Sequence, residues 1–301
     1  MVIAGVLKYC FDKHYRFQYD ALKGKYNNLD DKEYLKRLYF AKMHKPLDLD
    51  TPRTFNEKIN WLKLYDRKDL YTQMVDKYGV KKYVTDLLGA KYVAPLLGVW
   101  DSFSEIDIDS LPDRFVLKTT HGCGGMLICR DKSKCDFTRA GKELEIALRR
   151  NYYFTVREWP YKNVVPRIIA EEYLDDPMQE VLNVYKVFNF NGEPKIIQAI
   201  QGDKTKNESI DYFDVDWNLL ELRQNYPNSS LHLQRPEQLE KMLELSRKCS
   251  KGHPFLRTDW YIVRGEIVFS EFTFYSDAGM EAFHPEKWDR ILGDWIELPK
   301  V

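Results

Sequence analysis

The chain has 301 residues, enough for two or three domains with a substantial buried core. It carries 46 basic and 46 acidic side chains, so its net charge gives no general attraction to nucleic acid or to an anionic membrane. An anionic substrate must therefore be bound by a local cluster of basic residues, and we expect no nucleic-acid partner.

The cysteines and the N-terminal residues indicate the compartment. The five cysteines are odd in number and include no CxxC pair, which disfavours a zinc site or a disulfide framework and is typical of a reducing cytosol. The apolar start, MVIAGVL, is much shorter than the roughly 20 residues that a transmembrane helix needs, and it lacks the features of a secretory signal. We expect a soluble, cytoplasmic protein without a transmembrane segment.

The first elements along the chain are predicted to be helices. Residues 54–66 place aromatic and leucine side chains at helical spacing. Thr54 and Glu57 have the pattern of a capping box, in which each side chain bonds the backbone N–H of the other residue. Residues 70–88 predict one further continuous helix, with Gly89 as its C-terminal glycine.

Beyond these helices the pattern changes to short strands and hairpins. The predicted strands are residues 91–100, 114–122, 126–131, 167–174, 181–190, 193–200, 255–263 and 266–274, and the predicted helices are residues 138–153 and 235–252. Asn191-Gly192 between two alternating runs is a strong hairpin signal. Because the strands follow one another as hairpins, the sequence predicts an α+β protein and disfavours a doubly wound parallel sheet.

The glycine-rich segment HGCGG, residues 121–125, separates two predicted strands. It fits neither a P-loop, which ends in Gly-Lys-Ser or Gly-Lys-Thr, nor a dinucleotide-binding turn, which opens a helix. Glycines between antiparallel strands let backbone N–H groups approach a phosphate, and Lys118 on the preceding strand would add positive charge there. The alternative is a flexible hairpin tip, and this segment alone leaves both interpretations open.

Asp259 and Glu271 stand on the two strands of the last predicted hairpin. If the loop between these strands is residues 264–266, the two carboxylates face each other and Arg257 faces Thr273. Facing carboxylates repel unless a cation lies between them, and Mg²⁺ is bound by one or two carboxylates together with substrate phosphates. A two-residue turn would instead place the acids on opposite faces. The alternative is a surface hairpin whose acids face water or Arg257.

Several of these motifs, taken in order, resemble the ATP-grasp superfamily. The glycine loop after Lys118, the strand that ends in AEEYL and the later pair of acids are similar to that superfamily from about Asp76 onwards. The closer resemblance is to the TupA-like (teichuronopeptide biosynthesis) ATP-grasp family, and it includes the N-terminal segment. The motifs that carry it are TFNEKINWLKLYDR, FVLKTTHGCGG, YKVFNFNGEPKII, RTDWYIVRGEI and EFTFYSDAG.

The resemblance implies an ATP-grasp fold in which ATP and Mg²⁺ lie between two α+β units. Glu171 would accept a hydrogen bond from the adenine amino group, and the backbone of Glu172 and Leu174 would complete the hinge. The implied nucleotide-binding residues are Lys77, Lys118, Gly122, Gly124, Gly125, Glu171, Glu172 and Leu174. The implied magnesium ligands are Asp259, Glu271 and Thr273, and the candidate catalytic residues are Lys186, Arg257 and His121.

The sequence departs from the superfamily in two places. Many ATP-grasp enzymes carry asparagine where Thr273 stands, and a hydroxyl is a weaker magnesium ligand, so the number of ions stays open. Residues 1–75 are predicted to be helical rather than a βα-type unit, so the acceptor surface is not carried over. The basic candidates for an anionic acceptor are Arg149, Arg150, Arg157, Arg167 and His253.

The resemblance divides the chain into a helical N-terminal segment (1–75), a small subdomain with the glycine flap (76–174) and a large subdomain with the metal-binding hairpin (175–301). It implies a ligase that activates a small-molecule or glycan carboxylate as an acyl phosphate and joins it to an amine, in cell-surface polysaccharide, capsule or teichuronopeptide biosynthesis. Two alternatives stay open: a kinase of the same fold acting on a sugar or glycan hydroxyl, and a glycosyltransferase. The sequence leaves the acceptor and the oligomeric state open.

Overall fold

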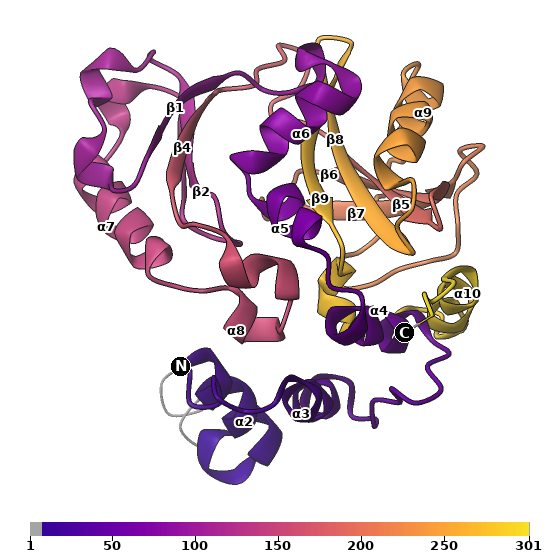
Figure 1. The fold of residues 1–301 in the computed structure, drawn as a ribbon. Helices are drawn as coiled ribbons and strands as arrows, with labels where there is room; N and C mark the ends of the chain where they lie inside the picture. The colour runs from indigo at the N-terminus through magenta and orange to yellow at the C-terminus, as the bar shows by residue number, and fades with distance from the viewer. Residues whose placement is uncertain (1–7, 301) are drawn as a thin grey trace.

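The computed structural model describes residues 8–300 and is an α+β protein with two antiparallel sheets (Figure 1). The helices are α2 (Lys13–Leu22), α3 (Asp31–Met43), α4 (Phe55–Tyr65), α5 (Asp69–Val75), α6 (Gly79–Leu88), α7 (Phe137–Leu148), α8 (Tyr153–Val156), α9 (Leu239–Ser250) and α10 (Lys287–Trp295). The strands are β1 (Leu96–Trp100), β2 (Phe115–Thr119), β3 (Met126–Cys129), β4 (Ile168–Glu172), β5 (Val184–Phe190), β6 (Glu193–Gln201), β7 (Ser209–Asp214), β8 (Phe255–Val263) and β9 (Glu266–Thr273).

Two expectations concern the N-terminal residues and membranes. The apolar start MVIAGVL, residues 1–7, lies outside the described residues. Between residues 8 and 300, none of the helices is both long enough and apolar enough to span a bilayer.

Helix α4 packs against two C-terminal segments, α10 and the turn after β9. The predicted capping box is confirmed, because Thr54 accepts from the N–H of Glu57 and Glu57 accepts from the N–H of Thr54. The N–H of Asn56 donates to the buried carboxylate of Asp289 in α10 at 3.0 Å. Since α4 also contacts the turn that follows β9, it supports the lower end of the second sheet (Figure 1).

The predicted continuous helix over residues 70–88 is wrong, because the chain forms two helices, α5 and α6, with a break at Asp76. Asp76 has an extended backbone with ψ 114°, and its side chain accepts from the N–H of Tyr78 at 3.0 Å. The N–H of Lys77 donates to the carbonyl of Thr120, at the start of the glycine loop, at 3.1 Å. This long-range hydrogen bond replaces a helical one and brings Lys77 to the loop.

The first sheet has the strand order β1-β4-β2-β3. Phe115 and Leu117 of β2 are fully buried in a core that α7 covers through Leu144. Because successive strand residues point to opposite faces, Val116 and Lys118 project from the other face, toward the second sheet.

The second sheet has the order β7-β6-β5-β8-β9, and α9 packs against its β8, β5 and β6 strands. The predicted turn at Asn191-Gly192 is confirmed, with left-handed φ angles of 51° and 88° that suit a two-residue hairpin.

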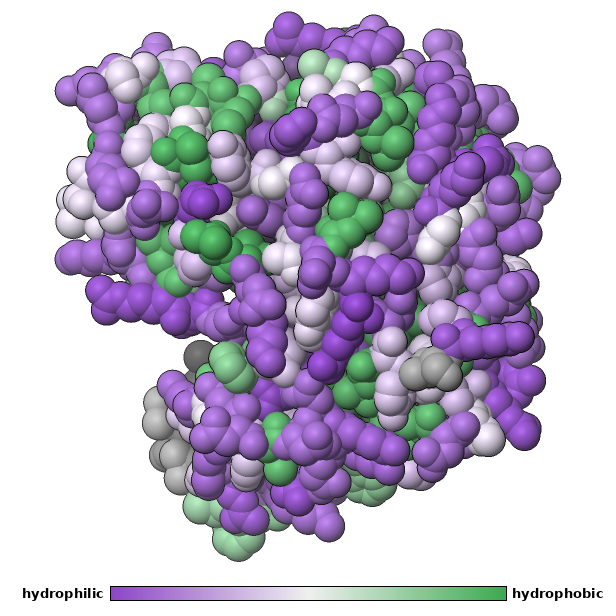
Figure 2. All heavy atoms as spheres, in the orientation of Figure 1, coloured by the Kyte–Doolittle hydropathy of each residue, from purple (hydrophilic) through white to green (hydrophobic). Residues whose placement is uncertain are grey.

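Strand β7 and helix α10 were not predicted. The short β7 sequence SIDYFD alternates too briefly to separate it from the surrounding loops, and pairing with β6 buries its Tyr212. Hydrophilic side chains cover most of the face in Figure 2.

The last hairpin combines a two-residue turn with a bulge. The turn consists of Arg264 and Gly265 alone, with φ angles of 51° and 82°, so the predicted three-residue loop is wrong. Ser270 is an extra residue in β9 that shifts the register by one position. Asp259 and Glu271 consequently do pair across the two strands, as predicted.

His253 is buried and is no surface ligand for an acceptor. Its ring packs against Tyr71 and Phe274, with centroid distances of 5.3 and 5.6 Å. Its Nδ1 has no hydrogen-bond partner within the described part of the chain. Burial lowers the pKa of His253 to about 4. Because the folded state favours the neutral ring, the stability of this site is complete above about pH 6.5 and is lost as the pH falls toward 4.

We expect His253→Phe to remove part of the acid sensitivity of the protein. Between pH 7 and pH 4, wild type should lose as much as about 3 kcal/mol more unfolding free energy than this variant, as measured by urea unfolding. His44→Asn, which replaces an exposed histidine, is the control and should keep the wild-type pH dependence. The same pH dependence in His253→Phe and wild type would contradict the prediction.

Candidate active site

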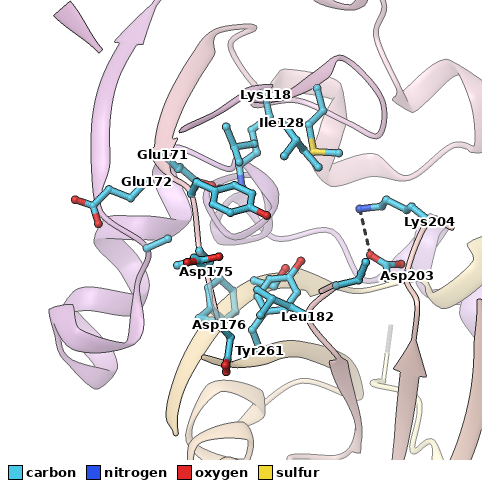
Figure 3. Close-up of a pocket in the computed structure, with 18 of the residues that line it drawn as sticks. Lys118, Ile128, Glu171, Glu172, Asp175, Asp176, Leu182, Asp203, Lys204 and Tyr261 are labelled. Atoms are coloured by element: carbon cyan, nitrogen blue, oxygen red, sulfur yellow. Dashed lines mark ion pairs between the residues drawn. The ribbon is translucent and has the colours of Figure 1, made fainter. Parts of the chain in front are cut away.

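A cavity of about 330 Å³ lies between the two sheets (Figure 3). One wall comes from α6 and the first sheet, and the other comes from β8, β9 and the loop after β6. The apolar residues of the lining are Val80, Val93, Ala94, Val116, Met126, Ile128, Leu174, Val181, Leu182 and Phe269. The predicted nucleotide-binding residues that line it are Lys77, Lys118, Glu171, Glu172 and Leu174. A mainly apolar slot with a few charged groups is typical of a small-molecule site.

Glu171, in β4, is held by two lysines. Its carboxylate pairs with Nζ of Lys118 and with Nζ of Lys81, both at 2.6 Å. Burial opposes the charge of Glu171, but the two ammonium groups lower its pKa below the ordinary value. Lys81 was missed by sequence reasoning, although its spacing of one helical turn from Lys77 was a usable signal. The ion pair with Glu171 positions Lys118. The contact between Glu171 and adenine stays a prediction.

The chain that follows Glu171 forms the edge of the cavity. Glu172 is exposed, and its N–H already donates to the carbonyl of Pro95 at 3.1 Å. Leu174 lines the cavity, and its N–H has no hydrogen-bond partner among residues 8–300. A free backbone donor beside an apolar slot suits a ring nitrogen of a base, and the hinge at this residue stays a prediction.

The glycine loop between β2 and β3 is anchored at its base. Nζ of Lys77 donates to the carbonyl of Gly122 at 2.5 Å. His121 is 4% exposed, and its Nε2 lies 2.9 Å from the carbonyl of Arg150, just beyond α7. Burial lowers the pKa of His121, which favours the neutral ring. The structure therefore places His121 where it holds the loop on α7 and does not place it in the cavity lining.

Gly124 and Gly125 have different surroundings although both have left-handed backbones, with φ angles of 94° and 62°. A Cβ atom on Gly125 would lie 2.5 Å from the Cβ of Ala147, so packing requires glycine there. A Cβ atom on Gly124 would meet no atom within 4 Å. Gly124 therefore borders open space, where its backbone is accessible to a ligand.

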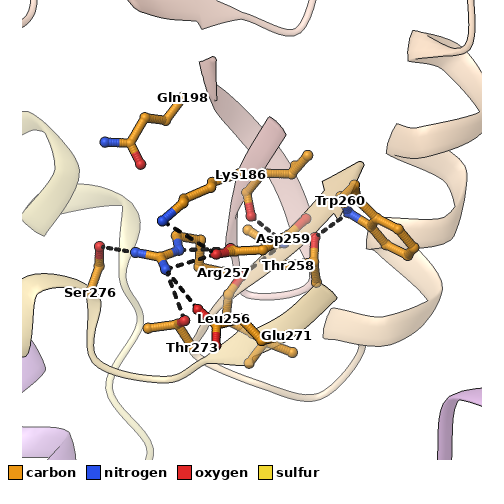
Figure 4. Close-up of polar contacts among 12 residues, drawn as sticks. Lys186, Gln198, Leu256, Arg257, Thr258, Asp259, Trp260, Glu271, Thr273 and Ser276 are labelled. Carbon is orange, nitrogen blue, oxygen red and sulfur yellow. Dashed lines mark hydrogen bonds and ion pairs between the residues drawn. The ribbon is translucent and has the colours of Figure 1, made fainter. Parts of the chain in front are cut away.

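The two facing acids of β8 and β9 differ in environment (Figure 4). Asp259 is 1% exposed and accepts from Nε and Nη2 of Arg257 at 2.8 and 2.9 Å. Nζ of Lys186 lies 3.5 Å from the same carboxylate. The side chain of Glu271 is 44% exposed and lies 3.8 Å from Arg257, which also donates to Thr273 at 3.0 Å. Arg257 thus supplies part of the positive charge that we expected between the two acids. A contact between the acids and Arg257 is what the alternative interpretation, a surface hairpin without a metal ion, predicts.

The charges of four basic side chains act on Glu271, of which Arg257 is 3.8 Å away. Partial burial opposes its charge, but the nearby Lys77, Lys186 and Arg257 lower its pKa below the ordinary value. Lys118 acts in the same direction from the first sheet. The fold therefore brings basic groups of distant sequence origin to one place, as binding of a polyphosphate requires.

The oxygen atoms of Asp259, Glu271 and Thr273 fit a magnesium site in their chemistry. Mg²⁺ prefers oxygen ligands and usually takes one or two carboxylates together with phosphates. Glu271 accepts no side-chain hydrogen bond within the described chain, whereas Asp259 shares its oxygens with Arg257 and keeps further lone pairs. Across residues 8–300, no group of three or more His, Cys, Asp or Glu residues is placed to hold a metal ion. Nucleotide phosphates would therefore complete the coordination of an ion held here.

Comparisons with known proteins agree with this architecture. Two antiparallel sheets with a charged cavity between them are the arrangement that the resemblance to ATP-grasp proteins implies. The family model "TupA-like ATPgrasp" matches residues 57–297, and the chain belongs to this family. A comparison with curated protein sequences found no match.

Several solved structures are similar to this chain at low identity. D-alanine–D-alanine ligase from Helicobacter pylori has a TM-score of 0.45 and 13% identity over 81% of this chain and 69% of its own. The ligase of the same name from Bacillus anthracis, complexed with ATP, has a TM-score of 0.39 and 16% identity over 67% and 55%. N5-carboxyaminoimidazole synthase from Aspergillus clavatus has a TM-score of 0.37 and 14% identity over 67% and 44%. This chain thus spans only part of each of these proteins.

Lys204 is a second basic residue that sequence reasoning missed. It lies on the loop after β6, lines the cavity opposite Lys118 (Figure 3) and is 3.5 Å from Asp203. Its backbone is left-handed, with φ 61°. The segment QGDKTKN looks like an ordinary polar loop in the sequence, so only the fold reveals that Lys204 faces the cavity.

Gly124→Val is expected to leave the protein folded and to slow ATP turnover by about tenfold or more. A β-branched side chain obstructs the approach of the loop to phosphates and disfavours positive φ. Gly252→Val is a matched control, because Gly252 has φ 81°, meets no atom within 4 Å and lies just after α9, outside the cavity lining. Turnover and melting temperature should be measured for both. Unchanged turnover in Gly124→Val would identify the loop as an ordinary hairpin tip.

Proposed function

We propose that the protein is an ATP- and Mg²⁺-dependent ligase that joins a carboxylate to an amine through an acyl phosphate. One observation supports this proposal most strongly. Arg257 lies 3.8 Å from Glu271, and the charges of Lys77, Lys118 and Lys186 act on the same carboxylate. Such a site neutralises a transferred phosphoryl group, and it needs no nucleophilic side chain.

Different residues would bind the base, the phosphates and the magnesium ion. The base would occupy the apolar slot beside Leu174, and Lys77, Lys118 and the glycine loop would hold the phosphates and exclude water. Mg²⁺ held by Asp259 and Glu271 would neutralise charge on the transferred phosphoryl group.

The proposed reaction has two steps, formation of an acyl phosphate and formation of an amide. An oxygen of the donor carboxylate attacks the γ-phosphorus as the bond to ADP breaks. The amine nitrogen then attacks the acyl carbon, inorganic phosphate leaves and an amide bond forms.

The finer assignments are part of the same proposal. The proposed division of the chain is a helical N-terminal segment (1–75), a small subdomain with the glycine flap (76–174) and a large subdomain with the metal-binding hairpin (175–301), of which the structure describes residues 8–300. The family suggests that the substrates are uronates or glutamate chains and amino acids or amino sugars, used in the cytoplasm for surface-polysaccharide, capsule or teichuronopeptide biosynthesis. Support for this role comes from the family match alone.

Product analysis distinguishes the proposal from its two alternatives. The protein should be incubated with Mg²⁺-ATP, glucuronate, galacturonate or glutamate, and a panel of amino acids and amino sugars. A ligase releases inorganic phosphate only when both carboxylate and amine are present. A kinase makes ADP and a phosphorylated sugar without inorganic phosphate, and a glycosyltransferase would consume UDP-glucose or UDP-glucuronate supplied in a parallel incubation. Either of these two outcomes would overturn the ligase assignment.

A further inference from the structure

A second cavity, a surface groove of about 460 Å³, is formed by α2, α3 and the residues that follow α3. These helices lie below α8 and α4 in Figure 1, on the side away from the two sheets. The groove is lined by Lys13, His14, Phe17, Lys36, Arg37, Phe40, Pro46 and Leu47. None of these residues lines the nucleotide cavity, so the groove is separate from the site described above.

The two helices contribute the same pattern of side chains to the groove. Each has two adjacent basic residues and a phenylalanine one turn later, namely Lys13, His14 and Phe17 in α2 and Lys36, Arg37 and Phe40 in α3. Residues one turn apart share a helix face, so basic and apolar groups lie together on both helices. The ring of Phe17 packs against Tyr26, with a centroid distance of 4.7 Å. Leu47 is 5% exposed and Phe40 is 40% exposed, so the apolar floor of the groove is open to solvent at Phe40.

The charges of the groove are not balanced by acids. No acidic residue lines it, and Lys13 and Lys36 form no ion pair with any residue in the range 8–300. Arg37 pairs with Glu33 at 2.6 Å, but both side chains are about half exposed, and such surface pairs are weak. The carboxylate of Asp12 accepts two backbone N–H groups at the start of α2. The groove therefore carries a local excess of positive charge, although the chain as a whole is neutral.

An apolar stretch of sequence precedes the first residue of the groove. Phe11, two residues before Lys13, is 85% exposed. Residues 1–7, MVIAGVL, lie outside the described residues and contain no acidic side chain. They could cover an apolar floor, but they could not neutralise the basic groups beside it. An anionic partner with an apolar part is therefore a better match to the groove than the chain's own N-terminal residues.

We propose that this groove docks the protein on an anionic membrane. The basic side chains bind the phosphate of an acidic phospholipid, and the first carbons of its acyl chains contact Phe17 and Phe40. The inference goes beyond the proposed ligase function and does not depend on it. Basic side chains next to exposed aromatic residues are typical of surfaces that lie on a bilayer without crossing it.

The zero net charge of the chain does not oppose this docking. Salt screens the field of a membrane within a Debye length, which is about 10 Å at 0.1 M salt. Only the charges close to the bilayer therefore contribute, and each Lys or Arg there typically strengthens binding about fivefold. The unpaired Lys13 and Lys36 are consequently the residues with the largest expected contribution.

The test is cosedimentation of the full chain with vesicles. One set is phosphatidylcholine alone, and the other is an equimolar mixture of phosphatidylcholine and phosphatidylglycerol, each at about 0.1 M and 1 M salt. One variant combines Lys13→Gln with Lys36→Gln, and a second is Phe40→Ser, which keeps the charges. The control combines Lys195→Gln with Lys251→Gln, which removes the same charge at exposed positions outside both cavities.

We expect wild type and the control to bind the vesicles that contain phosphatidylglycerol, to bind phosphatidylcholine alone far more weakly, and to be released at 1 M salt. The double lysine variant should bind about 10- to 30-fold more weakly. Phe40→Ser should bind about fivefold more weakly, because it removes apolar contact area. The melting temperature and the binding of an ATP analogue should stay unchanged in all these proteins.

Three results would overturn the proposal. The first is equal binding of wild type to both kinds of vesicle, and the second is equal binding of the double lysine variant and its control. The third is a wild type that binds neither kind of vesicle, or that binds only after residues 2–7 are removed. Binding after that removal would show that the chain's own N-terminal residues close the groove.

Discussion

Glu271→Gln is expected to lower ATP-dependent turnover by at least about 100-fold while the protein still binds the nucleotide. The substitution keeps the size of the side chain but removes a half-exposed carboxylate that faces Asp259. Its charge matters most in the transition state, when phosphoryl transfer needs the ion held there. We expect a slightly lower melting temperature without metal, because Lys77, Lys186 and Arg257 lose a counter-charge. Turnover, nucleotide affinity and melting temperature together test this.

A matched control lies on the same strand. Glu266→Gln makes the same chemical change at an exposed position of β9 and should keep full turnover. If Glu271→Gln retained turnover within about threefold of this control, a difference of under 1 kcal/mol, Glu271 would not belong to the reaction site.

Asp259→Asn is a poorer test than the sequence alone indicated. Facing carboxylates were expected to repel, so that removing one charge would not destabilise the protein. In the structure, however, the Asp259 carboxylate is the bidentate partner of the buried Arg257. Removing it leaves a buried guanidinium without its counter-charge, which typically costs about 3–5 kcal/mol. Lost activity in this variant would therefore mix catalysis with folding.

Lys118→Ala is expected to weaken binding of an ATP analogue by about 10- to 100-fold. The loss has two physical causes. The variant removes an ammonium group that projects into the cavity, and it leaves the Glu171 carboxylate paired with Lys81 alone. The remaining negative charge at Glu171 then opposes the phosphates. Calorimetric titration with the Mg²⁺ complex of the analogue measures the effect.

Lys195→Ala is the control for this prediction, because Lys195 is an exposed strand lysine outside the cavity. Its affinity for the analogue should equal that of wild type. If Lys118→Ala and Lys195→Ala bound the analogue equally well, the assignment of Lys118 to the phosphates would be wrong, and the Lys118–Glu171 pair would be structural.

Local signals in the sequence were enough for much of the fold. The capping box at Thr54 and the Asn191-Gly192 turn depend on neighbouring residues, and both are present. The break at Asp76 was missed because a distant carbonyl, that of Thr120, takes the N–H of Lys77. The bulge at Ser270 was missed for a similar reason, since register depends on pairing along the whole hairpin.

The candidate site was predicted as residue types but not as a set of contacts. The spacing of Asp259 and Glu271 indicated that they face each other, which the register confirms. The pairing of Asp259 with Arg257 and the position of Lys204 depend on which side chains the two sheets bring together.

The central claim is that this chain binds ATP with magnesium in the cleft between its two sheets. The most direct measurement is calorimetric titration of the protein with a non-hydrolysable ATP analogue, with and without Mg²⁺, beside UDP-glucose and UDP-glucuronate. We predict one saturable, magnesium-dependent site for the ATP analogue that Lys118→Ala weakens, and no measurable binding of either UDP-sugar. Binding of a UDP-sugar without binding of the ATP analogue would contradict the claim.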